Sequence, residues 1–267
     1  FRSIQGITEL LPVSSTVHMR VVPALLGWQD PGSAFSAAMQ LAALAAVVSY
    51  FWRDVRQVVT GSIGAVRQGD YNNQWFKLAV AIVLATIPIG IAGLALSSTL
   101  NACNSPLRGL MVIGIACVVM AVLLAAAELS ARHTRKVSEM RLRDALIVGI
   151  AQIGALIPGV SRSGSTLTAA LFLNFKREEA ARFSFLLGLP AIALAGLKEL
   201  WVLLHADMPA HAWPHLLFGL VVASVSAFFA IWGLMKFLER FSTWPFVIYR
   251  ALLGIFLIVA VSTGLLS

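Results

Sequence analysis

The feature that most constrains this chain is a series of apolar segments, each about as long as a membrane is thick. A helix that crosses about 30 Å of hydrocarbon needs about 20 mostly apolar residues. Six such segments are present: 33–52, 75–97, 107–127, 183–204, 214–235 and 246–265. Only 12% of the 267 residues are charged, whereas soluble domains carry roughly 25%. The sequence therefore predicts an all-α integral membrane protein with six transmembrane helices.

The same composition excludes several other classes of protein. With 59% hydrophobic residues the chain is too apolar for intrinsic disorder or a collagen-like repeat, and two cysteines are too few for a disulfide scaffold. Polar residues occur within the first nine positions, so no cleavable signal peptide is visible. Because the chain starts abruptly at Phe1, we expect that some native N-terminal residues are missing.

Basic residues exceed acidic ones by 20 to 12, and their positions indicate topology rather than a nucleic-acid partner. Fifteen of the twenty fall on one side of the predicted membrane, in 53–77, 128–143, 176–182 and 236–250. The connections 98–106 and 205–213 carry none. Since Lys and Arg concentrate in cytoplasmic loops, we expect the first span to run from outside to inside and no nucleic acid to bind.

Two further apolar stretches are interrupted and do not fit as spans. Stretch 1–27 is broken by the polar run 12–16, and stretch 144–175 by the run 158–166. The flanking helices would be about 10 to 14 residues long, too short to cross a membrane. Each stretch therefore predicts a re-entrant helix–loop–helix hairpin, whose irregular backbone must be buried in protein or line a watery cavity.

The order of these segments predicts an inverted internal repeat. Aligning Pro12 with Pro158 superimposes V-S-S-T on G-V-S-R-S-G-S-T, and further on Phe35 falls near Phe183. Each half, 1–127 and 128–267, then has one hairpin and three spans. Because three is odd, the second half must have the opposite orientation. We expect one membrane domain, with its site between residues 5–18 and 158–166.

The first polar run carries groups suited to acid–base chemistry. Gln5 and Glu9 are four residues apart and share a helical face. After Pro12 come Ser14, Ser15, Thr16 and His18. A carboxylate at membrane depth is usually functional, although a Glu near the interface can also simply reach water. A lone His18 would fit a packing role, but in this company an acid–base role is favoured.

The second polar run resembles an anion cradle. Arg162 lies between Ser161 and Ser163, and its planar fork suits phosphate oxygens. We expect Gly164 to turn backbone N–H groups inward and the next helix to begin near Thr166, with its dipole favouring an anion. The alternative is that Arg162 pairs with Glu9 for structure alone.

Together the two runs predict a phosphate-handling site for a lipid with a phosphate head and a long hydrocarbon tail. Glu9 could hold a hard divalent cation such as Mg²⁺. Either Ser15 attacks the terminal phosphorus or an activated water does, and the sequence leaves both routes open. Gln40 and Gln152 either line the cavity or hydrogen-bond between helices.

The motifs Q-G-I-T-E-L-L-P-V-S-S-T-V-H at 5–18 and P-G-V-S-R-S-G-S-T at 158–166 resemble the two signatures of the bacterial undecaprenyl-pyrophosphate phosphatase family. The resemblance covers the whole chain. It implies a multi-pass enzyme of the bacterial inner membrane that removes the terminal phosphate of undecaprenyl pyrophosphate. Such enzymes recycle the carrier lipid for peptidoglycan synthesis and confer bacitracin resistance.

By this resemblance the catalytic residues are Glu9, Ser15, His18 and Arg162, with phosphate bound by Ser14, Thr16, Ser161, Arg162, Ser163, Gly164 and Thr166. It also implies a divalent metal, Mg²⁺ or Ca²⁺, a homodimer, and a site that opens toward the periplasmic face. Gln5 stands at a position where the family has Glu or Gln, and Val17 replaces a small residue. Because Gln5 is a poorer metal ligand, Glu9 would carry that role alone.

A transporter or flippase of a phosphorylated polyprenyl lipid is the alternative. Inverted repeats with broken helices that meet at the membrane midplane are typical of transporters. A transporter needs the phosphate grip but not a hydroxyl, a carboxylate and a histidine together, so the residues favour an enzyme.

Overall fold

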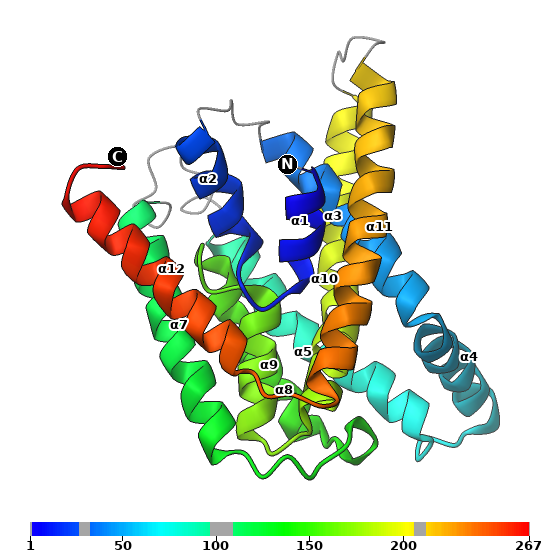
Figure 1. The fold of residues 1–267 in the computed structure, drawn as a ribbon. Coiled ribbons are helices and arrows are strands. Elements are labelled where there is room, and N and C mark those ends of the chain that lie inside the picture. Colours follow the sequence, from blue (N-terminus) through cyan, green and yellow to red (C-terminus); the bar gives the residue numbers. More distant parts are fainter. Residues whose placement is uncertain (1, 27–32, 97–108, 206–211, 267) are drawn as a thin grey trace.

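This computed structural model describes residues 2–26, 33–96, 109–205 and 212–266, and within them the chain is helical, with no strand (Figure 1). The α-helices are α1 (Arg2–Leu10), α2 (Ser15–Leu26), α3 (Ser33–Tyr50), α4 (Trp52–Gln68), α5 (Gln74–Ala95), α7 (Leu110–Ser130), α8 (Leu142–Gln152), α9 (Arg162–Phe172), α10 (Arg177–Leu204), α11 (Ala212–Leu238) and α12 (Trp244–Ser262). Two short 3₁₀ helices, η2 (Val137–Glu139) and η3 (Ile153–Leu156), flank α8.

Five described helices are long and apolar enough to cross a membrane, namely α5, α7, α10, α11 and α12. They correspond to five of the six predicted spans, and α5 and α10 continue through Pro88 and Pro190. The remaining predicted span, 33–52, is helical from Ser33 to Tyr50, but only Gln40–Tyr50 counts as an apolar helix in the described part. A multi-pass membrane protein is supported, and the sixth span stays a prediction.

The basic stretch 53–77, predicted as a connection between two spans, is largely helical. It contains the 17-residue helix α4, which follows a turn at Phe51 and ends at Gln68, and the next residue, Gly69, has a left-handed φ of 70°. Apolar residues recur at helical spacing on α4, and Trp52, Val59 and Ile63 remain exposed. The arginines of this segment indicate its side of the membrane, whereas its apolar periodicity indicates an amphipathic helix.

Both interrupted stretches form two short helices around a polar turn, as predicted. α1 and α2 have 9 and 12 residues, and α8 and α9 have 11 each. At about 1.5 Å per residue none of them exceeds about 18 Å, so each is too short to cross a membrane.

The second helix of the second hairpin begins four residues earlier than predicted. α9 starts at Arg162 rather than near Thr166. The reason is that Ser161 acts as the N-cap, with its Oγ accepting the Gly164 N–H at 3.2 Å. Ser163 and Gly164 therefore belong to the first helical turn and not to a loop.

Each hairpin packs against a long helix from the other half of the chain. α1 lies on α11, and α8 lies on α5. Both contacts need a glycine, because a Cβ on Gly6 would lie 2.5 Å from the Ala223 carbonyl oxygen and one on Gly149 would lie 2.4 Å from that of Ala85. The two halves are thus interlocked rather than stacked side by side.

The last long helices of the two halves, α7 and α12, cross at a pair of glycines (Figure 1). A Cβ on Gly114 would lie 3.1 Å from the Gly254 carbonyl oxygen, and a Cβ on Gly254 would lie 2.7 Å from that of Gly114. Small residues allow such close backbone approach between membrane helices. The contact is reciprocal, as it would be across a two-fold axis.

Candidate functional site

The turns of the two hairpins meet in the middle of the molecule (Figure 1). Ser163 at the start of α9 donates a hydrogen bond from its Oγ to the Leu11 carbonyl oxygen at 3.2 Å. These residues are 152 positions apart in the chain. The structure therefore brings together the two polar runs that the sequence analysis combined into one site.

Arg250 holds the two turns together from α12. Its guanidinium donates to the Pro12 carbonyl of the first turn at 3.1 Å and to the Gly159 and Val160 carbonyls of the second at 2.8 and 3.0 Å. The residue is 1% exposed. Grouping Arg250 with the cytoplasmic basic residues was wrong, because the turns bury it by supplying these carbonyl oxygens.

Each turn passes through a serine with left-handed backbone just before its helix. Ser14 precedes α2 and Ser161 precedes α9, and both have a φ of 68°. This conformation costs a residue with a Cβ on the order of 1–2 kcal/mol. The Ser14 hydroxyl is buried without a hydrogen-bond partner in the described structure, and an unsatisfied buried polar group in a strained turn is typical of a ligand site.

Arg162, the first residue of α9, reaches along α10 to Gly188. A Cβ on Gly188 would lie only 1.5 Å from the Arg162 Nη1, so the guanidinium occupies the space that a side chain would fill. The Nη1 is buried and has no hydrogen-bond partner among the described groups. The charge of Glu9 acts on Arg162, but the two form no ion pair in the described part of the chain. An ion pair with Glu9 therefore does not fix the position of the Arg162 guanidinium.

His18 is fixed from both sides. Its Nδ1 lies 2.8 Å from the Ser14 carbonyl oxygen, and its Nε2 lies 2.5 Å from the Tyr249 hydroxyl. Because a carbonyl oxygen only accepts, the Nδ1 carries a proton, and Tyr249 donates to Nε2 when the ring is neutral. The His18 and Tyr249 rings lie nearly parallel, with centroids 5.7 Å apart.

Sequence reasoning missed Tyr249 and Arg250 as members of this cluster. Both lie inside an apolar span that was predicted from its length and hydropathy, and Arg250 was counted only as a cytoplasmic basic residue. An arginine within a transmembrane helix was the available signal, since ionisable residues at membrane depth are costly.

The remaining predicted residues divide by accessibility. Ser15 and Thr16 open α2, with Ser15 half-buried and Thr16 exposed. Thr166 is fully buried, with its Oγ1 bonded to the Arg162 carbonyl at 2.8 Å and to the Ser184 hydroxyl at 2.5 Å. The side chain of Gln5 lies outside the described residues.

Gly164 has a different role from the one expected. Its N–H is used by the Ser161 cap at 3.2 Å, and it does not adopt a positive φ. A Cβ there would lie 2.8 Å from the Arg250 Nη1. Glycine at this position therefore makes room for the arginine that joins the turns.

The glutamines left open by the sequence differ in their surroundings. Gln152 is fully buried at the end of α8, and both its amide atoms lack a hydrogen-bond partner in the described structure. It therefore forms no hydrogen bond between the described helices. Gln40 in α3 is half-buried.

An apolar pocket of about 440 Å³ opens beside His18 and Tyr249. Its walls come from α1, from the first turn and from the start of α12: Ile7, Thr8, Leu11, Val13, Pro245 and Phe246. A second groove of about 480 Å³ between α1 and α11 shares Ile7, Leu11 and Phe246 with it. The polar cluster is thus bordered by a continuous apolar surface.

The described residues contain no group of three or more His, Cys, Asp or Glu side chains that could hold a metal ion. The half-buried Glu9 is the carboxylate nearest in sequence to the first turn. Mg²⁺ usually keeps several waters and binds through one or two carboxylates plus the phosphates of a substrate. A single carboxylate fits a cation that arrives with, or is shared by, a diphosphate.

Comparison with known proteins gives matches over nearly the whole chain. Residues 3–256 match the family model described as bacitracin resistance protein BacA. Undecaprenyl-diphosphatase 2 of Mesorhizobium japonicum is 71% identical over 264 residues, which cover 99% of this chain and 100% of that protein. Undecaprenyl-diphosphatase of Gloeobacter violaceus is 51% identical over 98% of this chain and 90% of its own length. The protein of the same name from Synechococcus elongatus is 47% identical, with coverages of 99% and 92%.

Proposed function

Because the chain belongs to the family of the bacitracin resistance protein BacA, we propose that it hydrolyses undecaprenyl diphosphate to undecaprenyl phosphate and inorganic phosphate in the bacterial inner membrane. This reaction recycles the carrier lipid of peptidoglycan synthesis. The observation that carries the proposal for the site is the buried, unpartnered Nη1 of Arg162 beside the junction of the two turns. A cationic N–H group buried without a hydrogen-bond partner is costly, and a substrate phosphate would satisfy it.

The phosphate-binding groups in this proposal come from both turns. Arg162 binds the terminal phosphate, and the unpaired hydroxyl of Ser14 adds a hydrogen bond from the first turn. Ser161 and Ser163, whose hydroxyls lie 3.2 Å apart, line the same junction, and Thr16 lies on the exposed side of α2. The N-terminus of α9 adds a favourable dipole for an anion. Gly164 and Thr166 support this arrangement through Arg250 and Ser184.

The bond that breaks joins the terminal phosphorus to the bridging oxygen. Either the Ser15 hydroxyl or a water attacks this phosphorus, and undecaprenyl phosphate leaves with the bridging oxygen. Ser15 and His18 are three residues apart on one face of α2. Glu9 takes the proton of the nucleophile, or His18 takes it at Nε2, in which case the Tyr249 hydroxyl turns from donor to acceptor at this nitrogen and still orients the imidazole. A phosphoserine formed by Ser15 would then be hydrolysed by water.

Glu9 would hold a divalent metal, Mg²⁺ or Ca²⁺, together with the oxygens of the diphosphate. Such a cation would neutralise charge that develops on the phosphate oxygens. Arg162, Ser14 and His18 keep the roles given above whether or not a cation is present.

The hydrocarbon tail follows the apolar surface beside the cluster in this proposal. The pocket near His18 and Tyr249 leads toward the groove between α1 and α11. An undecaprenyl chain lying there would keep its diphosphate at the two turns without leaving the bilayer.

For the topology we propose six spans and two re-entrant hairpins in an inverted repeat, with the site open to the periplasmic face. α1 of the first half packs on α11 of the second, and α8 of the second half packs on α5 of the first, which supports the repeat. The equal φ values of Ser14 and Ser161 support it as well. In the structure, Val13 and Ser14 of the first turn correspond to Val160 and Ser161 of the second. This correspondence is shifted by one residue from the sequence alignment of Pro12 with Pro158. The homodimer implied by the family resemblance stays a prediction.

Release of inorganic phosphate from a polyprenyl diphosphate by the purified protein in detergent, with Mg²⁺ or Ca²⁺, tests this function. Arg162→Ala and Glu9→Gln should each lower kcat/KM by at least about 10²-fold, because each removes a charge that acts on the reacting phosphate. Arg132→Ala, which removes an exposed cation outside the site, should retain activity.

Two outcomes would contradict the proposal. One is no phosphate release by the wild type, which together with lipid movement between vesicle leaflets would indicate the transporter. The other is full turnover by both the Arg162 and the Glu9 variants.

A further inference from the structure

A second pocket, far from the two turns in sequence, lies where the start of α5 meets η2 and α10. It has a volume of about 440 Å³ and is lined by Trp75, Lys77, Lys136, Ser138, Glu179 and Arg182, among others. A volume of this size is typical of a small-ligand site. None of these residues belongs to the machinery proposed above.

The pocket and its border carry cations that are not neutralised by the protein. Lys77 on α5 and Lys136 before η2 are exposed, and Arg141 lines the adjoining groove. Within the described residues none of these three forms an ion pair. The N-terminal turn of α5, which also borders the pocket, contains no acidic residue and adds a favourable dipole for an anion.

The acidic groups nearby are already engaged with other partners. Asp54 pairs with Arg182, and Asp144 with Arg135. Glu179 accepts the Val137 N–H at 2.8 Å, and Glu139 accepts the Lys136 N–H at 2.7 Å. Glu179 also pairs with Arg182 at 3.7 Å, and within the described residues none of these carboxylates lies within ion-pair distance of Lys77 or Lys136.

An apolar groove of about 370 Å³ continues from this pocket, with Lys77 and Met140 lining both. Phe76 and Val80 of α5 and Leu142 of α8 form its apolar walls. Beyond the groove, exposed apolar residues continue along the same helical face of α5: Val83, Ile87, Ile91 and Leu94. Leu146 and Ile150 extend the neighbouring face of α8. A cationic pocket thus leads into a lipid-facing strip between two packed helices.

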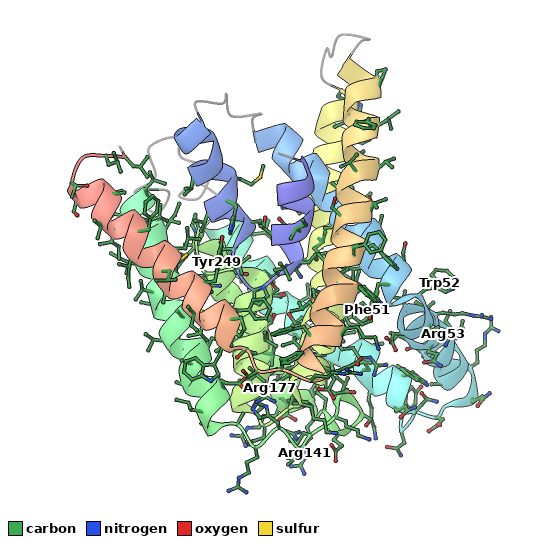
Figure 2. All side chains as sticks on the ribbon, viewed as in Figure 1. Phe51, Trp52, Arg53, Arg141, Arg177 and Tyr249 are labelled. Carbon is green, nitrogen blue, oxygen red and sulfur yellow. The ribbon has the colours of Figure 1, made fainter. Side chains whose placement is uncertain are left out.

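We propose that this pocket binds the phosphate head group of an anionic phospholipid whose acyl chain lies between α5 and α8. A basic pocket between membrane helices matches such a head group. The continuous apolar strip favours a lipid over a soluble phosphate, which would gain nothing from it. The pocket lies at the basic end of the molecule, where Arg141 and Arg177 are found (Figure 2).

The test is binding of phosphatidylglycerol, with phosphatidylcholine as the zwitterionic comparison, measured by native mass spectrometry on the purified full chain. Each basic side chain near a membrane surface contributes about fivefold to anionic-lipid affinity. The Lys77→Gln/Lys136→Gln double variant should therefore bind phosphatidylglycerol on the order of 30-fold more weakly. The charge-matched Arg132→Gln/Arg240→Gln variant, whose exposed cations lie outside the pocket, should bind it like the wild type.

Arg162→Ala separates this site from the proposed catalytic one and should leave phosphatidylglycerol binding unchanged. Three results would overturn the proposal. The first is equal weakening in both double variants, which indicates a diffuse charge effect. The second is loss of binding in Arg162→Ala, which indicates that the lipid occupies the catalytic site. The third is full competition by glycerol phosphate at equal concentration, which indicates a soluble anion.

Discussion

Gly188 determines whether Arg162 can take the position seen beside α10. Replacing it with alanine would place a methyl group on the guanidinium, and the flexible arginine would have to move. We expect Gly188→Ala to fold with wild-type stability, because alanine favours a helix over glycine. Its kcat/KM for phosphate release should fall by about 10²–10³-fold, as when an oriented charge donor is lost. Thermal unfolding and a phosphate assay measure the two effects separately.

Gly90→Ala is the matched control, because a Cβ there meets no atom within 4 Å. It should keep both stability and activity. If Gly188→Ala turns over substrate like Gly90→Ala, the position of Arg162 does not matter for the reaction.

Tyr249 should act through His18 rather than on the substrate. Tyr249→Phe removes the hydroxyl that lies 2.5 Å from the His18 Nε2 but keeps the stacked ring. We expect kcat to fall about tenfold, less than the 10²–10⁴-fold of a complete acid–base group because the imidazole itself remains, with an unchanged KM and a displaced pH profile. Tyr50→Phe, whose ring instead packs against Phe51 and Phe228, is the control. An unaltered pH profile in Tyr249→Phe would argue against this positioning role.

At the scale of elements, the start of α8 depends on one carboxylate. Asp144 accepts the Arg141 N–H at 2.9 Å and pairs with Arg135. Burial opposes ionisation, but these hydrogen bonds and the charges of both arginines hold the pKa of the Asp144 carboxyl below its usual range. Asp144→Asn should cost about 1 kcal/mol or more of stability at pH 7, because the amide can still accept the Arg141 N–H but loses the charge-assisted bond to Arg135.

The pH dependence of that cost has a definite sign. Because the folded-state pKa of Asp144 is lowered, its contribution is fully present above the ordinary aspartate pKa of about 3.9. It is lost as the pH falls through the lowered folded-state value. Thermal unfolding of wild type and Asp144→Asn should therefore differ at pH 7 and converge in strong acid. A difference that persists unchanged in acid would contradict this origin.

The sequence predicted these elements well where one local signal dominated. Apolar runs located five long helices, and the prolines and serines of 12–16 and 158–166 located both turns. The start of α9 was misplaced because Gly164 suggested a loop, whereas the Ser161 cap begins the helix at Arg162. α4 was missed because its charges concealed an amphipathic period.

At the scale of the whole molecule, the proposed topology predicts on which side of the membrane an introduced cysteine can be labelled. In a background without Cys103 and Cys117, Asp207→Cys should react with an impermeant thiol reagent from the periplasm. Arg132→Cys should react only after the membrane is opened. Reaction of Asp207→Cys solely from the cytoplasm would reverse the orientation. Asp207 lies outside the described residues, so this experiment rests on the charge pattern alone.

Contacts between distant parts of the chain were the least predictable from sequence. The sequence predicted only that the two turns meet, because the inverted repeat places both turns at the same depth in the membrane. Arg250 contacts carbonyls 90 to 238 positions away. Because every residue has a backbone carbonyl, the sequence does not indicate which of them an arginine will contact. The role of Gly188 is equally difficult to predict from the sequence, since it depends on the Arg162 side chain of another helix, α9.

The position of Arg250 near the end of the chain affects when the site can exist during synthesis. Pro12 is made 238 residues before the arginine that holds its carbonyl. At about 5–20 residues per second, the first turn waits on the order of 10–50 s for this contact. A nascent chain that stalls before α12 therefore carries Glu9, His18 and Arg162 in the membrane without an assembled pocket. Under the proposed function, competence for hydrolysis therefore arrives only with the last helix, and unfinished copies do not act on the carrier lipid.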